Sequence, residues 1–179
     1  MIEFNGSTIQ EAERLLGGIK DALPKAQANA INRSLSTTRA ETVRAVREDY
    51  IVSADSVRKS IVLKTASASN PVGAVISKGS PIALSNFDAG GKPVKARVKK
   101  GSSPKPIKSS FEVGMKSGHT GVFKRKGKAR LPIQELYGPS IPQMIGSENV
   151  IKKIEEKAME TLDKRMDHEI NRVLERGRL

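Results

Sequence analysis

The amino-acid sequence predicts an α+β fold, with helices at both ends of the chain and a small, mostly antiparallel sheet between them. Residues 7–50 and 147–176 have apolar side chains at helical spacing, which favours helices. Residues 61–126 contain short apolar runs separated by Gly, Pro and Ser, which favours strands joined by turns. We expect the 179 residues to form one domain, residues 1–179, because this length is typical of a single domain.

Two helices are predicted within residues 1–50. The first opens with a capping box, in which Ser7 is the N-cap residue and Gln10 can reach back to it. Pro24 suits the first turn of the second helix, since its missing N–H has no partner there. Residues 25–50 contain neither Gly nor Pro, so this second helix is expected to continue without a break.

A short helical turn is predicted at residues 53–57, and the central region follows it. Residues 88–92 are expected to form a flexible turn, and residues 99–110, rich in Gly, Ser, Pro and Lys, a long mobile basic loop. Strands are predicted where short apolar or alternating runs occur. These runs are residues 61–66, 72–76, 94–98, 110–114 and 121–125.

Residues 127–146 are unusual because they combine many apolar side chains with Pro132, Pro139 and Pro142. Proline has no backbone N–H, so this segment can be neither a regular helix nor a central strand. We expect it to lie extended against a surface, either the chain's own core or a partner protein. The apolar side chains proposed for a protein interface are Leu131, Ile133, Leu136, Tyr137, Ile141 and Met144.

The long C-terminal helix is predicted over residues 147–176, with Ser147 as its N-cap. Apolar residues recur every fourth position from Val150 to Leu174. Each such step advances by about 40° around the helix, so the row winds around it. Two interpretations follow: the helix packs first on its own domain and later on another subunit, or it curves over its own core.

Composition limits the kind of core that the chain can form. Hydrophobic residues make up 37% of the sequence, aromatic residues 3%, and there is no Trp and no Cys. A thin aliphatic core indicates that part of the stability comes from assembly, so we expect a homo-oligomer. No run of 18 apolar residues occurs, so neither a membrane-spanning helix nor a membrane partner is expected. The N-terminus has no signal-peptide pattern.

The positive charge is concentrated in one stretch of the chain. The net charge is +13, and residues 92–130 hold 13 Lys or Arg and a single acidic residue, Glu112. Such clustering favours an anionic partner, either nucleic acid or an acidic protein face; the alternative is a solvated loop kept soluble by its lysines. The candidate contact residues are Lys92, Lys95, Arg97, Lys99, Lys100, Lys105, Lys108, Lys124, Arg125, Lys126, Lys128 and Arg130.

The sequence offers little that would support catalysis. The two histidines, His119 and His168, stand alone, in a turn and on a predicted helix respectively. Zinc-ligand spacing, a phosphate-binding loop and a nucleophile elbow are all absent from the sequence. Phe111 and Phe123 could stack on bases, but the scarcity of aromatic residues favours a place in the core. We therefore predict a protein that is not an enzyme and that uses no cofactor or metal.

Several motifs nevertheless resemble a known family. They are the stretch from Ser80 to Phe87, Phe111, the stretch GVFKRKGKARLPIQELYGPSIPQM and the N-terminal stretch from Ala28 to Ser34. Together they are similar to the minor tail protein Z family of long-tailed bacteriophages, and the resemblance covers about residues 23–153. Its most specific part is R-x-x-x-x-R-L-P-I-x-x-L-x-G-P-S, which begins at Arg125. No catalytic residue is carried over from this family.

The resemblance implies a structural tail-completion protein of the virion. Such a protein would act at the head-proximal end of the tail, at the neck, around the DNA path, and would assemble in the host cytoplasm. Its partners would be the tail terminator, the head–tail connector and the tape measure, with a possible non-specific contact to double-stranded DNA. Two alternatives stay open: a free, non-specific DNA-binding protein that uses residues 92–130, and a tail assembly chaperone.

Overall fold

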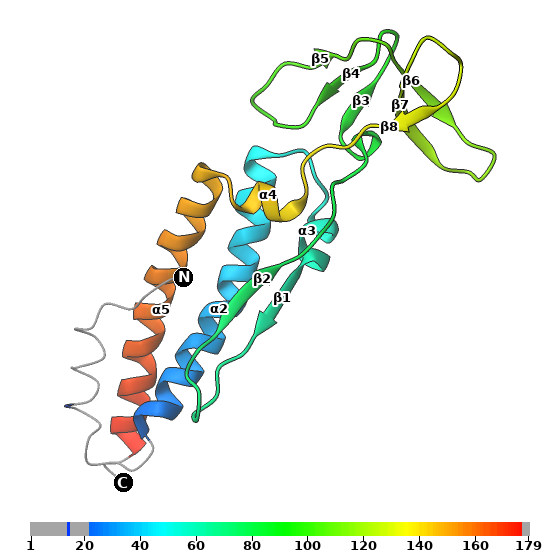
Figure 1. Cartoon of the computed structure of the whole chain (residues 1–179). Helices are drawn as coiled ribbons and strands as arrows, with labels where there is room; N and C mark the ends of the chain where they lie inside the picture. The colour runs from blue at the N-terminus through cyan, green and yellow to red at the C-terminus, as the bar shows by residue number, and fades with distance from the viewer. Residues whose placement is uncertain (1–13, 15–21, 177–179) are drawn as a thin grey trace. The chain divides into compact units, whose positions relative to one another are not determined.

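The computed structural model describes Arg14 and residues 22–176, and it shows the predicted α+β fold (Figure 1). The first predicted helix lies almost entirely outside the described residues. Contacts within the chain group into two compact units. Unit 1 comprises Met1–Val43, Ile61–Ser77 and Ile151–Leu179, and unit 2 comprises Arg44–Ser60 and Lys78–Val150. That both belong to one domain stays a prediction.

Unit 1 is built on two long antiparallel helices, α2 (Ala22–Asp49) and α5 (Glu148–Arg176), which lie side by side in Figure 1. The hydroxyl of Ser34 on α2 donates a hydrogen bond to the carbonyl oxygen of Ala158 on α5 at 3.3 Å. Ala26 and Ala30 on α2 are fully buried. Their small side chains let neighbouring backbones approach closely, which offsets the lack of aromatic residues in this core.

The hairpin of β1 (Ile61–Lys64) and β2 (Ala74–Ser77) packs against α2 in unit 1. Asn32 on α2 donates to the carbonyl oxygen of Ala66 at 2.9 Å and accepts from the N–H of Ala66 at 2.8 Å. Gly73 lies so close to the helix that an added Cβ would be 2.6 Å from a methyl of Ile31. The end of the hairpin is therefore fixed to α2 by paired hydrogen bonds and by close contact.

The apolar row on α5 is covered within the chain itself. Its first six members are between 0 and 7% exposed, and the last, Leu174, is half-buried. This burial favours the interpretation in which α5 packs on the chain's own core. Ser147 directly precedes α5, and its hydroxyl donates to the carbonyl oxygen of Met144 at 2.8 Å.

Unit 2 contains short helices and two three-stranded antiparallel sheets, with strand orders β3-β4-β5 and β6-β7-β8. The sequence predicted one small sheet, whereas the described residues form three when the β1-β2 hairpin is included. The elements of unit 2, besides the end of α2 and the start of α5, are α3 (Ala54–Ser60), the 3-10 helix η1 (Leu84–Asn86), β3 (Asp88–Gly90), β4 (Lys95–Arg97), β5 (Lys105–Pro106), β6 (Ser110–Gly114), β7 (Thr120–Arg125), β8 (Ile133–Glu135) and α4 (Ile141–Ile145).

Three short elements in unit 2 differ from the sequence prediction. Residues 88–92 were expected to form a flexible turn, but 88–90 are strand β3, which pairs with β4. Strand β5 lies inside the predicted loop 99–110 and pairs with the other edge of β4. Helix α4 interrupts the segment that was expected to be extended through residue 146. In each case pairing or capping by neighbouring residues outweighs a weak local preference.

Candidate functional site

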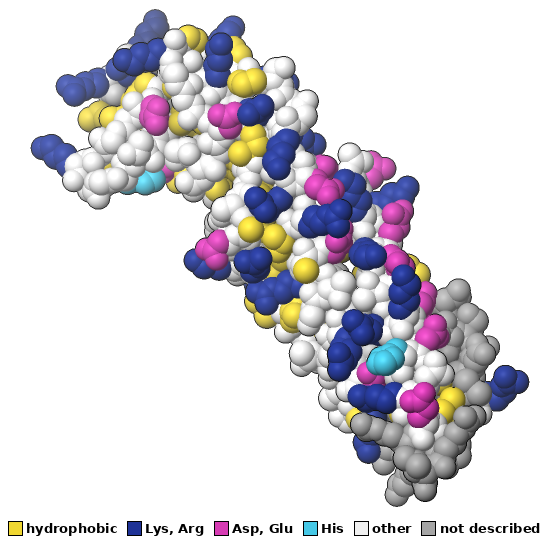
Figure 2. Space-filling model, turned by 180° about the vertical axis from the view of Figure 1, so that it is seen from behind, with side chains coloured by type: hydrophobic (Ala, Val, Ile, Leu, Met, Phe, Trp, Pro, Cys, Tyr) yellow, Lys and Arg dark blue, Asp and Glu magenta, His cyan; other side chains and the backbone are white. Residues whose placement is uncertain are grey.

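The predicted basic residues lie on the strands and connecting turns of unit 2. Figure 2 shows many Lys and Arg side chains over the β3–β8 part of the molecule, at the upper left of the view, with few acidic ones among them. Of the twelve candidate contact residues, eleven are exposed and Arg97 is half-buried. Unit 2 as a whole has 18 Lys or Arg and 7 Asp or Glu, so it holds most of the chain's excess charge.

Arg97 is committed to an ion pair within the fold. It lies directly opposite Asp88 in the β3–β4 register. Its Nη2 is 2.7 Å from Oδ2 of Asp88, and its Nε donates to the same oxygen at 2.9 Å. Cross-strand pairs of opposite charge stabilise a sheet modestly. Arg97 therefore helps to hold the short strand β3 in place, which leaves it less available to an outside anion than its neighbours.

Two of the candidate cations also contact aromatic rings. The Nζ of Lys99 lies 5.4 Å from the ring centre of the buried Tyr50, and the guanidinium carbon of Arg125 lies 5.8 Å from that of Phe111. Both distances fall within the range of cation–π attraction. Phe123 is 5% exposed, as predicted for a core residue, whereas Phe111 is only half-buried beneath Arg125.

The proline-rich segment is tied to unit 2 by backbone hydrogen bonds on both sides. Strand β8 pairs with β7, and the N–H of Leu136 continues this pairing by donating to the carbonyl oxygen of Val122 at 2.8 Å. On its other side, the carbonyl oxygen of Leu136 accepts from the N–H of Leu84 at 2.9 Å. The N–H of Gly138 donates to Ile82 at 2.8 Å. The segment thus lies against the chain's own fold, with β8 at the edge of its sheet and residues 136–138 bonded to residues 82–84.

Helix α4 follows because its first turn is capped and Pro142 fits there. Ser140 is the N-cap residue of a capping box with Gln143, and Pro142 lies in the first turn, where a missing N–H costs nothing. The helix turns Ile141 and Met144 into the core, where they are 4% and 0% exposed. A partner therefore cannot reach these two predicted interface residues while unit 2 is folded.

The exposed members of the predicted interface are Leu131 and Tyr137. Their exposed fractions are 66% and 55%, whereas Ile133 and Leu136 are half-buried. Large apolar side chains exposed to this extent are candidates for contact with a partner. Of the six residues predicted for the interface, these two offer the most accessible apolar surface.

The fold also brings together three side chains that the sequence did not connect. The Nε2 of His119 lies 2.8 Å from Oε1 of Glu135, and the hydroxyl of Tyr137 donates to Oε2 of Glu135 at 3.0 Å. The hydrogen bond from the Tyr137 hydroxyl to Glu135 raises the pKa of Tyr137 above 10.0, and the negative charge of Glu135 is the second cause. His119 and Glu135 are sixteen residues apart, so no local pattern could have revealed their contact.

The described residues provide few other features for a chemical site. Among them, no group of three or more His, Cys, Asp or Glu side chains is arranged to hold a metal ion. None of the helices in this part of the chain is long and apolar enough to cross a membrane. His168 is exposed on α5.

Comparison with known proteins agrees with the motifs in residues 80–145. None of the curated proteins or solved structures with which the chain was compared matches it. In contrast, the sequence model of the family described as prophage minor tail protein Z (GPZ) matches residues 8–177, nearly the whole chain. The chain therefore belongs to the minor tail protein Z family, and its role is that of a structural protein of a bacteriophage tail.

Proposed function

We propose that this chain is a tail-completion protein at the head-proximal end of the tail. In this proposal it assembles as a homo-oligomer with neck and tail proteins around the DNA path, and it is needed for a functional joint between head and tail. It performs no catalysis and uses no cofactor. Membership of a minor tail protein family supports the structural part of the proposal.

The observation that supports a place beside DNA is the exposed charge of unit 2. Residues 92–130 contain 13 basic side chains and one acidic side chain, and nearly all the candidate contact residues are exposed. DNA carries a dense row of phosphates, so such a surface would bind it without reading its sequence. The same field would also attract an acidic face of a neck or tail protein.

Leu131 and Tyr137 are the proposed contact with a neighbouring tail or neck protein. Both are exposed, and both belong to a segment whose backbone is hydrogen-bonded to unit 2. A segment held in this way presents its exposed side chains in a defined arrangement, which lowers the entropic cost of binding. Apolar contact is therefore assigned to this segment, and electrostatic contact to residues 92–130.

Gold-labelled antibodies against this protein, imaged on purified phage particles by electron microscopy, test the proposed location. The proposal expects gold at the end of the tail nearest the head, on assembled particles and on isolated tails. Label at the distal tip would overturn the location while keeping a tail role. A protein found in lysates but missing from particles would instead support the assembly-chaperone alternative.

A further inference from the structure

Strand β6 has a free edge. Within the described residues it pairs only with β7, so the side of β6 that faces away from β7 has no strand partner. Free strand edges are places where another polypeptide can add a strand through main-chain hydrogen bonds. Natural proteins usually protect such edges, so an open one in a protein that works by assembly requires a reason.

The register identifies which backbone groups face this edge. Val122 on β7 accepts a hydrogen bond from Leu136 on the β8 side, so its backbone groups face β8 rather than β6. Glu112 lies directly opposite Val122 in the β6–β7 pair. By the alternation of an antiparallel ladder, the N–H and C=O of Glu112, and the N–H of Gly114 two residues on, face the free edge.

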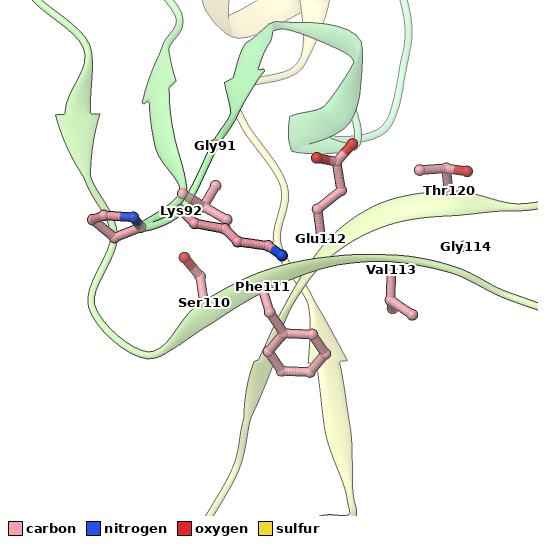
Figure 3. A pocket seen from close by; sticks show the side chains of 10 residues that line it. Gly91, Lys92, Ser110, Phe111, Glu112, Val113, Gly114 and Thr120 are labelled. Carbon is pink, nitrogen blue, oxygen red and sulfur yellow. The ribbon is translucent and has the colours of Figure 1, made fainter.

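The free edge borders an open cleft of about 650 Å³. One side of this cleft is the whole of β6, and the other is residues 91–94, which connect β3 to β4. Figure 3 shows Lys92 and Glu112 extending into the cleft between β6 and residues 91–94, whereas Phe111 and Val113 point away to the other side of β6. A strand added here would therefore lie beside the side chains of Lys92 and Glu112 as well as the backbone of β6.

Charge around the cleft determines what kind of segment fits. Lys92 lines the cleft, and Lys124 lies directly opposite Ser110 at one end of β6. Lys108 lies two residues before Ser110. These three cations are exposed, and Glu112 is the single acidic residue in the 92–130 stretch of the sequence. An acidic strand is favoured over a neutral or basic one.

We propose that the free edge of β6 is a strand-addition site for an extended, acidic segment of a partner protein. This goes beyond the proposed function, because it does not depend on where along the tail the chain lies. The backbone of β6 supplies the hydrogen bonds, and the surrounding Lys side chains select acidic residues at alternate positions of the added strand.

A short synthetic peptide of alternating Glu and Val, labelled for fluorescence anisotropy, is the probe. We expect it to bind the full chain and to slow amide exchange at Glu112 and Gly114. Glu112→Pro removes the outward N–H and fills the edge without touching the β7 ladder, so binding should fall at least about tenfold. Glu112→Gln is the matched control: it removes the same charge, keeps the N–H and should tighten binding.

A second probe does not depend on the folding of any variant. The same peptide with N-methyl groups on alternate residues keeps its charge but cannot pair along a strand, and it should not bind. If the unmodified peptide does not bind, or if its binding survives both N-methylation and Glu112→Pro, the proposal is overturned. Protection of the Glu112 amide by duplex DNA, with no effect of the peptide, would overturn it as well.

Discussion

The imidazole of His119 and the carboxylate of Glu135 meet at 2.8 Å across the β7–β8 sheet of unit 2. The second oxygen of that carboxylate accepts the hydroxyl hydrogen of Tyr137. Glu135 has only 16% of its side chain exposed, so these two partners satisfy a largely buried acidic group. This contact fixes the last residue of β8, two residues before the exposed Tyr137 proposed for a partner interface.

Gly121 is predicted to be essential for this arrangement. A Cβ added there would lie 2.7 Å from Oε1 of Glu135 and 2.9 Å from the ring of Phe123. Gly121→Ala should therefore lower the free energy of unfolding by about 1–3 kcal/mol, measured by urea denaturation. Gly127→Ala is the matched control, because nothing lies within 4 Å of a Cβ at that position. Equal effects of the two substitutions would contradict this packing.

Tyr137 should titrate at a higher pH than an ordinary tyrosine. Its pKa is raised above 10.0, first by the hydrogen bond to Glu135 and then by the charge of that carboxylate. The pKa of Tyr137 is higher in the folded than in the unfolded chain. The stability contributed by its bond to Glu135 is therefore complete below pH 10.0 and is lost as the pH rises through the folded pKa.

Ultraviolet absorbance in a Tyr50→Phe background isolates the titration of Tyr137, since the chain has two tyrosines. Glu135→Gln should lower the pKa of Tyr137 back toward 10.0. If the pKa is the same with and without that substitution, the hydrogen bond between the two side chains is not formed in solution.

Contact with DNA should be visible in the salt dependence of binding. Replacing Lys99, Lys100, Lys105 and Lys108 with Gln should reduce the slope of log affinity against log salt by about 3.6, if each lysine neutralises one phosphate. The control replaces four exposed lysines outside the 92–130 stretch, namely Lys25, Lys64, Lys78 and Lys152. Equal slopes for both variants would indicate a general charge effect and no contact by residues 99–108.

Substitutions in the proposed partner interface should impair incorporation into particles with little loss of stability. Leu131→Ser changes an exposed side chain and Tyr137→Ser also removes the hydrogen bond to Glu135, so together they should lower the free energy of unfolding by no more than about 2 kcal/mol. They should nevertheless prevent incorporation into particles, measured by immunoblot of purified virions. Val72→Ser, which changes a residue that is 59% exposed in unit 1, is the control and should be incorporated normally. Normal incorporation of the double variant would remove this interface from the account.

Sequence patterns predicted the elements whose signal is local. Strands β6 and β7 and helix α5 match their predicted ranges closely, because alternation or helical spacing is visible within each segment. Strand β3 was missed because Asp88-Ala-Gly has little preference for a strand. It pairs with β4 through its backbone, and the contact of Asp88 with Arg97, nine residues later, adds modestly to that pairing. Helix α4 was missed because Pro139 and Pro142 argue against a regular helix, whereas the capping box at Ser140 allows a single short one.

In the candidate site, too, local features were predictable from the sequence and contacts between distant residues were not. That the basic residues between Lys92 and Arg130 are mostly exposed follows from their charge and was predictable. The burial of Ile141 and Met144 was not predictable, because an apolar residue in an irregular segment fits a core and a partner equally well. Only the turn of α4 decides that these two face inward. The contact of His119 with Glu135 depends on the pairing of β7 with β8, which no short motif encodes.

Deletion of the gene from the producing phage or prophage, followed by electron microscopy and infectivity assays, tests the central claim most directly. A tail-completion role predicts either filled heads beside unjoined tails or joined particles that do not infect. The first outcome would assign the protein to joining, and the second to positioning of the DNA. Normal, infectious particles produced without the protein would contradict the account.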